Sequence, residues 1–118
     1  MCIRDRPVDD SVYARYLGGK GLATWLLLNY TRAGVDPLFA ENVIIFATGP
    51  ATDTRVFGSA RYGVYTKSPL TGIYCEAYSG GTVADALSRT GYDAVMIKGA
   101  SREPLYPVSY THLRAHET

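Results

Sequence analysis

Two short segments of this sequence carry the residue types that bind phosphate groups. Ser79-Gly80-Gly81 follows a predicted short strand and precedes a helical pattern, so its backbone N–H groups can gather at the start of a helix. Arg61 follows the small residues Gly58-Ser59-Ala60, which leave room for its guanidinium to reach and grip a ligand. Each segment is a candidate anion site, although neither one establishes such a site on its own. Taken singly, a tight turn and a solvated surface arginine are the alternative explanations.

A third glycine-rich segment, Gly18-Gly19-Lys20-Gly21, also precedes a helical pattern. No strand is predicted before it, and its spacing matches neither the Walker motif nor the dinucleotide-binding motif. We therefore interpret it as a flexible break between two packed helices rather than as a ligand site.

Residues 7–107 hold no catalytic constellation. This stretch has no histidine, and Cys75, its single cysteine, cannot hold a cluster or a zinc ion alone. Glu76 is a single carboxylate in a predicted strand, and the serines have no nearby base to activate them. We predict that the chain contributes no catalytic residue.

The two ends of the chain can be encoded by DNA sequences that are reverse complements of each other. Residues 1–5 can be encoded by ATGTGTATAAGAGAC, and residues 108–112 by its reverse complement, GTCTCTTATACACAT. Residues 108–118 also resemble a translated adapter end from sequencing-library preparation. We interpret residues 1–6 and 108–118 as adapter-derived and residues 7–107 as part of a longer protein. A native tail with a chance codon match is the alternative, and only then would His112 and His116 be metal-ligand candidates.

The composition excludes several classes of protein. The 118 residues are 47% hydrophobic and 19% charged, with a formal net charge of +1. This balance is unlike that of a disordered chain, and it gives no electrostatic reason to bind nucleic acid or an anionic membrane. No apolar run approaches the roughly 20 residues that span a bilayer. With one cysteine in residues 7–107, no disulfide can form within this stretch, and we expect a reducing compartment.

Hydrophobic periodicity and glycine or proline breaks predict a mixture of helices and strands. The predicted helices are residues 8–17, 22–30 and 83–90, and the predicted strands are 42–48, 61–67, 73–77 and 94–98, with one more beginning at 105–106. Because these elements do not alternate strictly as strand, helix, strand, the pattern favours an α+β fold.

The order of short motifs along the chain resembles one enzyme family. The run YLGGKGLATWLLL, residues 16–28, resembles the opening of the N-terminal domain of the tungsten-containing aldehyde ferredoxin oxidoreductases. Further blocks follow in the family's order: GVDPL (34–38), EN (41–42), IFATGP (45–50), ARY (60–62), TKSPLTG (66–72), YSGG (78–81) and TGYDA (90–94). Together the blocks cover nearly all of residues 7–107.

The resemblance implies a cofactor-binding base without a catalytic centre. In such a protein this segment is an incomplete, sheet-rich α+β half-shell, on which a tungstopterin (a bis-pterin tungsten or molybdenum cofactor) rests. By motif matching, Arg61 would contact a pterin phosphate, and Gly80, with Ser79 beside it, would approach the cofactor. Tyr78 stands where the family has an asparagine whose main-chain carbonyl ligates magnesium, so the carbonyl remains and the amide side chain is lost.

For the complete protein, the resemblance implies oxidation of aldehydes to carboxylic acids. Electrons would pass through a [4Fe-4S] cluster to ferredoxin, in a cytoplasmic homodimer. The cluster cysteines and acid/base residues would lie beyond Tyr106, so we expect the chain alone to be inactive. Two alternatives remain. One is a small non-enzymatic phosphate- or nucleotide-binding module with Arg61 and Gly80 as its anion site. The other is a paralogue that kept the shell and lost the cofactor.

Overall fold

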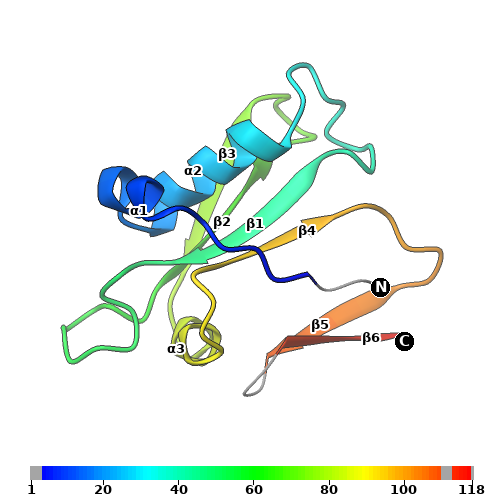
Figure 1. The fold of residues 1–118 in the computed structure, drawn as a ribbon. Helices are drawn as coiled ribbons and strands as arrows, with labels where there is room; N and C mark the ends of the chain where they lie inside the picture. The colour runs from blue at the N-terminus through cyan, green and yellow to red at the C-terminus, as the bar shows by residue number, and fades with distance from the viewer. Residues whose placement is uncertain (1–3, 110–112, 118) are drawn as a thin grey trace.

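The computed structural model describes residues 4–109 and 113–117, with side chains described for residues 4–108. Figure 1 shows its helices and strands in chain order. They are α1 (Asp10–Tyr16), α2 (Gly19–Tyr30), β1 (Val43–Thr48), β2 (Tyr62–Lys67), β3 (Tyr74–Ser79), α3 (Val83–Arg89), β4 (Ala94–Lys98), β5 (Leu105–Ser109) and β6 (Leu113–Glu117). Each predicted helix and strand is present. No described helix is long and apolar enough to cross a lipid bilayer.

The strands form a four-stranded antiparallel sheet in the order β3-β2-β1-β4, and β5 and β6 form a separate antiparallel pair. The apolar strand β1 lies inside the sheet, between β2 and β4. An antiparallel sheet with separate helices is the predicted α+β class. The β5–β6 pair lies across the predicted boundary between residues 107 and 108, and the division of the chain into native and adapter-derived parts stays a prediction.

Helices α1 and α2 lie on one side of the sheet, and α3 lies on the other (Figure 1). The buried residues of α2 pack on alternate residues of the central strands, because successive strand residues face opposite sides. The core on this side consists of Val12, Leu22, Ala23, Leu26, Leu27, Val43, Ile45, Ala47 and Tyr65.

The predicted break between two packed helices is present, but it lies at Leu17 and Gly18 and does not extend over residues 18–21. Helix α2 begins at Gly19, and the chain turns instead at Leu17, whose φ is +64°. A Cβ on Gly21 would lie 2.5 Å from the carbonyl oxygen of Tyr16. Glycine at this position therefore allows the end of α1 to pack closely against the first turn of α2.

Strand β3 is also longer than predicted. It continues to Ser79 because its pairing with β2 holds from Tyr74, opposite Lys67, to Ser79, opposite Tyr62. Tyr78 and Ser79 are therefore strand residues, and the glycine turn begins only at Gly80.

Candidate site at one end of strands β2 and β3

The structure brings Arg61 and Gly80 together. Arg61 immediately precedes β2 and Gly80 immediately follows β3, just beyond the paired residues Tyr62 and Ser79. A Cβ on Gly80 would lie 3.8 Å from the guanidinium carbon of Arg61 and 3.9 Å from its Nε. The absent side chain of Gly80 thus leaves one flank of the guanidinium open.

The guanidinium of Arg61 is available to a ligand. Arg61 is exposed, and its backbone N–H donates to the carbonyl of Ser59 at 2.8 Å. Among residues 4–109 and 113–117, no carboxylate pairs with this guanidinium; the ion pairs found there are Lys20–Glu76 and Arg89–Asp53. A cation with this freedom beside a glycine backbone can bind a phosphate.

Tyr78 and Ser79 are the last two residues of β3 and lie next to Gly80. The Ser79 hydroxyl donates to the carbonyl of Gly80 at 3.4 Å. The ring of Tyr78 meets that of Tyr65 edge-on, with centroids 6.1 Å apart. Tyr78 is 53% exposed and lies on β3, the outermost described strand beside β2.

A glycine inside β2 makes room for the Tyr65 ring. A Cβ on Gly63 would collide with the hydroxyl and ring carbons of Tyr65, which is 1% exposed. Burial raises the pKa of the Tyr65 phenol, which therefore stays protonated. Sequence reasoning missed this pair, although a glycine inside a strand is a known signal of close packing.

Sequence reasoning also missed a polar network between α2 and β3. The Lys20 Nζ lies 3.0 Å from Oε2 of Glu76, and the Tyr74 hydroxyl donates to the same oxygen at 3.3 Å. The Thr24 and Tyr74 hydroxyls are 3.1 Å apart. Hydrogen bonding and charge attraction between Lys20 and Glu76 raise the pKa of the lysine and lower that of the carboxyl. Both groups are therefore charged at neutral pH.

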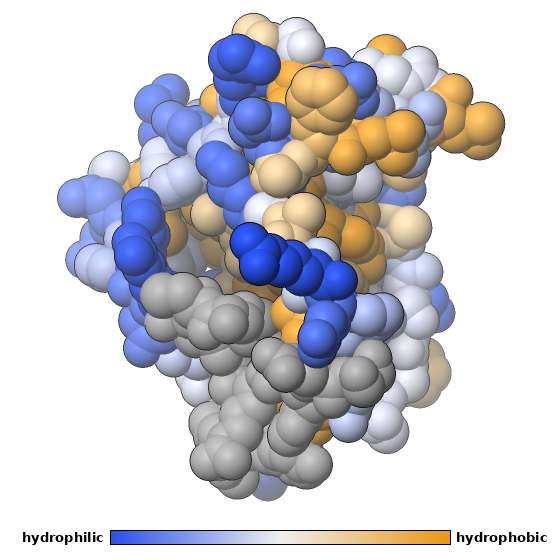
Figure 2. Space-filling model, turned by 90° about the vertical axis from the view of Figure 1, so that its right-hand side faces the viewer, coloured by the Kyte–Doolittle hydropathy of each residue, from blue (hydrophilic) through white to orange (hydrophobic). Residues whose placement is uncertain are grey.

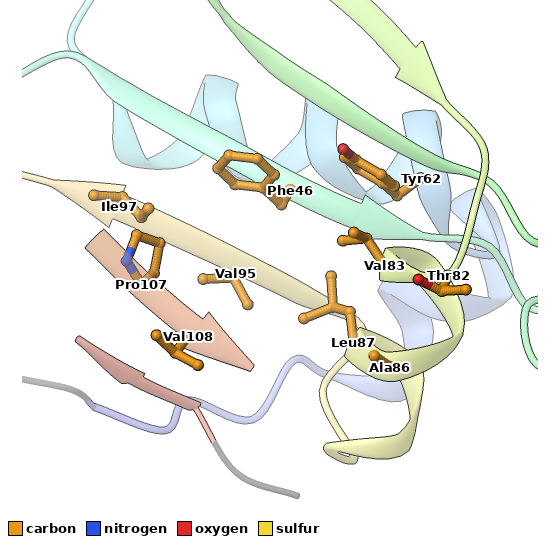
Figure 3. Close-up of a pocket in the computed structure, with 10 residues that line it drawn as sticks. All are labelled: Phe46, Tyr62, Thr82, Val83, Ala86, Leu87, Val95, Ile97, Pro107 and Val108. Carbon is orange, nitrogen blue, oxygen red and sulfur yellow. The ribbon is translucent and has the colours of Figure 1, made fainter. Parts of the chain in front are cut away.

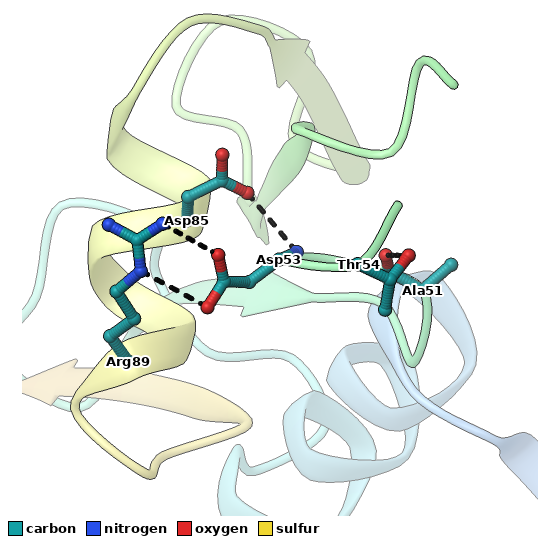
Figure 4. A network of polar contacts seen from close by, with 5 residues as sticks. All are labelled: Ala51, Asp53, Thr54, Asp85 and Arg89. Atoms are coloured by element: carbon teal, nitrogen blue, oxygen red, sulfur yellow. Dashed lines mark hydrogen bonds and ion pairs between the residues drawn. The ribbon is translucent and has the colours of Figure 1, made fainter. Parts of the chain in front are cut away.

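On the other side of the sheet, the loop between β1 and β2 is tied to α3 (Figure 4). The Arg89 guanidinium donates to both carboxylate oxygens of Asp53, at 2.8 and 3.1 Å. The Asp53 backbone N–H donates to the Asp85 carboxylate at 3.1 Å. Within the loop, the Thr54 hydroxyl donates to the Ala51 carbonyl at 2.6 Å. These bonds fix the first part of the loop that later reaches Arg61.

An apolar groove of about 380 Å³ lies between the four-stranded sheet, α3 and β5 (Figure 3). Its walls are side chains of the sheet, α3 and β5: Phe46, Tyr62, Thr82, Val83, Ala86, Leu87, Val95, Ile97, Pro107 and Val108. Neither Arg61 nor Gly80 lines it. The groove nevertheless lies close to the candidate anion site, because Tyr62, next to Arg61, and Thr82, two residues after Gly80, line it.

The described residues contain no group of three or more His, Cys, Asp or Glu side chains that could hold a metal ion. His112 lies outside the described residues. The predicted magnesium contact involves the backbone carbonyl of Tyr78, so it does not depend on such a group.

Comparison with known proteins identifies related sequences. Residues 2–110 match the family model described as "Aldehyde ferredoxin oxidoreductase, N-terminal domain". A tungsten-containing aldehyde ferredoxin oxidoreductase of Pyrococcus furiosus is 42% identical over 104 residues, which are 88% of this chain and 17% of that protein. The "aliphatic sulfonate oxidoreductase, WOR-like subunit" of the same organism is 27% identical, again over 88% of this chain and 17% of the relative.

A solved structure has the same fold. It is described as the active site complex BamBC of benzoyl coenzyme A reductase in complex with 1,5-dienoyl-CoA, and it matches with a TM-score of 0.88 and 31% identity. The match covers 93% of this chain and 17% of that chain. The chain thus spans only about a sixth of the length of the relatives that it matches.

Proposed function

We propose that this chain forms the base of a tungstopterin site in a larger oxidoreductase. The premise is that the chain belongs to the aldehyde ferredoxin oxidoreductase family, of which it is the N-terminal domain. The placement of Arg61 beside Gly80 carries this proposal, because it joins a free guanidinium to an open glycine backbone. The relatives named as tungsten-containing enzymes support tungsten as the metal, with molybdenum as the alternative.

The residues at this end of the sheet fit a phosphate of such a cofactor. The guanidinium of Arg61 would hold the phosphate oxygens by paired, charge-assisted hydrogen bonds. Gly80, with Ser79 beside it, would let the backbone approach the ligand, since a side chain on Gly80 would lie against the guanidinium. The main-chain carbonyl of Tyr78, near the end of the outer strand β3, would ligate magnesium, as the family resemblance implies.

In the whole enzyme, the bound cofactor would supply the oxygen-transfer and redox chemistry, and this chain would bind and orient it. We propose that the enzyme oxidises aldehydes to carboxylic acids, and that its electrons reach ferredoxin through a [4Fe-4S] cluster whose ligands lie outside this chain. The relatives named for aldehyde and ferredoxin are 38–42% identical to the chain, whereas the relative named for sulfonate is 27% identical. This difference supports an aldehyde, rather than a sulfonate, as the substrate. We also propose that the whole enzyme is a cytoplasmic homodimer.

The proposal is tested by the cofactor content of the full-length protein that contains this chain. Arg61→Ala should lower the tungsten and pterin bound per protein after anaerobic purification from a tungstate-fed host. Arg32→Ala, which removes an exposed arginine between α2 and β1, should leave both unchanged. Full cofactor content in Arg61→Ala would refute the assignment of this residue.

Cofactor content and a separate nucleotide-binding measurement distinguish the alternatives. A wild-type protein without tungsten or molybdenum from a competent host would support the paralogue that lost its cofactor. Saturable binding of a simple nucleotide to the isolated chain, lost in Arg61→Ala, would support the non-enzymatic binding module.

A further inference from the structure

The candidate site depends on how firmly the end of β3 is held. In the four-stranded sheet, β3 is an outer strand and pairs only with β2. Outer strands lack the second ladder of hydrogen bonds that fixes a central strand. Tyr78 and Gly80, which the proposed function places at the cofactor, belong to this end of β3 and the turn after it. Side-chain contacts with the helix can add to the restraint that this single ladder gives.

Helix α2 supplies these contacts at two points. Lys20 and Thr24 are four residues apart, so they project from the same side of α2. Glu76 and Tyr74 are two residues apart on β3, so they share one face of the strand. Lys20 meets Glu76 at 3.0 Å, and Thr24 meets Tyr74 at 3.1 Å. The hydrogen bond from Tyr74 to Glu76 joins the two contacts into one network.

The support for this network is itself firmly packed. Between Lys20 and Thr24, the helix buries Leu22 and Ala23 to 1% and 0% exposure. The contacts of Lys20 and Thr24 therefore attach the outer strand β3 to a helix that is itself firmly packed. The Lys20 side chain is 59% exposed and that of Glu76 is 30% exposed, so the pair lies at the rim of the core rather than inside it.

Tyr65 reaches β3 from β2. Its buried ring lies 6.5 Å from the Tyr74 ring and 6.1 Å from the Tyr78 ring, measured between centroids. It stands directly opposite Glu76 in the strand register. The three β3 residues on the α2 side, Tyr74, Glu76 and Tyr78, are thus each held by a side chain of α2 or β2.

We propose that Lys20 and Glu76 are positioning residues for the cofactor site: their ion pair ties the outer strand β3 to α2 and thereby holds Tyr78 and Gly80 beside Arg61. This inference rests on the proposed function, because it assigns the pair a role at the same site. It also gives a function to the GGKG segment of the sequence. Gly21 lets the helix start close to α1, and Lys20 connects that helix to β3.

The test uses the full-length holoprotein and four variants. Lys20→Met and Glu76→Gln each remove one charge, and the double variant Lys20→Glu/Glu76→Lys restores the pair in reverse. Lys98→Met is the matched control, because it removes an exposed lysine from β4 at the opposite edge of the sheet. Two quantities are measured: hydrogen exchange of the amides of residues 74–81, and the rate at which tungsten is lost during incubation in buffer.

Each single variant should raise both rates by about two- to fivefold, the range for a partly exposed ion pair. The reversed pair should bring both back toward wild type, and Lys98→Met should change neither. Exchange in residues 22–27 should stay constant in all four variants, which shows that the fold is intact. A purely structural loss would raise exchange there as well.

Two results would overturn the inference. If Lys20→Met alone speeds tungsten loss and the reversed pair does not rescue it, Lys20 contacts the cofactor directly. If neither single variant changes either rate while Arg61→Ala lowers the tungsten content, the proposed function stands and the positioning role falls. Arg61→Ala with full tungsten content is a different failure, because it refutes the proposed function on which the inference rests.

Discussion

The two faces of the four-stranded sheet use the same strands but are packed to different degrees. On the face under α2, Val43, Ile45, Ala47 and Tyr65 are all between 0% and 1% exposed. On the face toward α3, Phe46 of β1 and Val95 and Ile97 of β4 line an open groove of about 380 Å³. One face is a closed core, and the other retains apolar surface.

A second contrast separates the two ends of the sheet. The end with Arg61 and Gly80 combines glycine with a free cation. The loops at the opposite end expose Leu38, Phe39 and Leu70 to 80%, 60% and 92%, and the β1–β2 loop at the Arg61 end likewise exposes Val56 and Phe57. Figure 2 shows hydrophobic surface near the top of the view, where these loops lie in Figure 1, and in the recess at its centre. Among the described residues, an unpaired guanidinium and a glycine turn meet where the α2 face reaches the ends of β2 and β3.

The largest expected effect compares the same substitution on the two faces. Ile45→Ala should lower the free energy of unfolding by about 2–5 kcal/mol, because it leaves a cavity in the closed core. Ile97→Ala should cost about 1 kcal/mol, since Ile97 is 39% exposed beside the groove. Urea denaturation of the chain, followed by fluorescence of the single tryptophan, Trp25 on α2, measures both. Equal losses would contradict the contrast between the faces.

The next effect concerns the close packing around Tyr65. Gly63→Ala should destabilise the chain by about 1–3 kcal/mol, because the added methyl group collides with the Tyr65 ring. Gly49→Ala is the control, since its Cβ would meet no atom nearer than 4.0 Å and its φ needs no glycine. A difference of less than about 0.5 kcal/mol between the two variants would show that the ring can move aside.

The smallest effect concerns the link between α1 and the start of β4. Burial and a 2.8 Å hydrogen bond to the Asp93 carboxylate raise the pKa of the Tyr13 phenol to about 12, from its usual value of 10.0. The folded chain thus holds this proton more tightly than the unfolded chain does. The resulting stabilisation is complete below pH 10 and is lost between pH 10 and 12.

Tyr13→Phe should therefore lose less stability than the wild type as pH rises through this window. Melting temperatures measured at intervals from pH 9 to 12 would show the two curves converging. Tyr65 contributes to both curves alike, so its own titration does not affect the comparison. Parallel curves would mean that Tyr13 does not titrate differently in the folded and unfolded chain.

The secondary structure could be predicted because its signals are local. The β-branched run of β1 and the breaks at Gly49-Pro50 and Gly91 lie within a few residues of the elements that they define. The exception is residues 18–21, where the glycines looked like a break. Their use in close helix packing depends on the contact between Gly21 and Tyr16 in three dimensions.

The candidate site could be predicted only in part. Arg61 and the Ser79-Gly80-Gly81 turn were identified from residue types, and the strand register then places them side by side. The pairing of Lys20 with Glu76 joins residues 56 positions apart, and no local pattern indicates it. The collision that requires glycine at position 63 likewise depends on the rotamer of Tyr65.

The central claim is that Arg61 and Gly80 hold a phosphate of the cofactor, supported by the closed α2 face. The most direct measurement is an experimental structure of the full-length holoprotein. We predict a cofactor phosphate within hydrogen-bonding distance of the Arg61 guanidinium, next to the Gly80 backbone, with the Lys20–Glu76 pair intact. A cofactor bound elsewhere, with Arg61 facing solvent, would contradict the account.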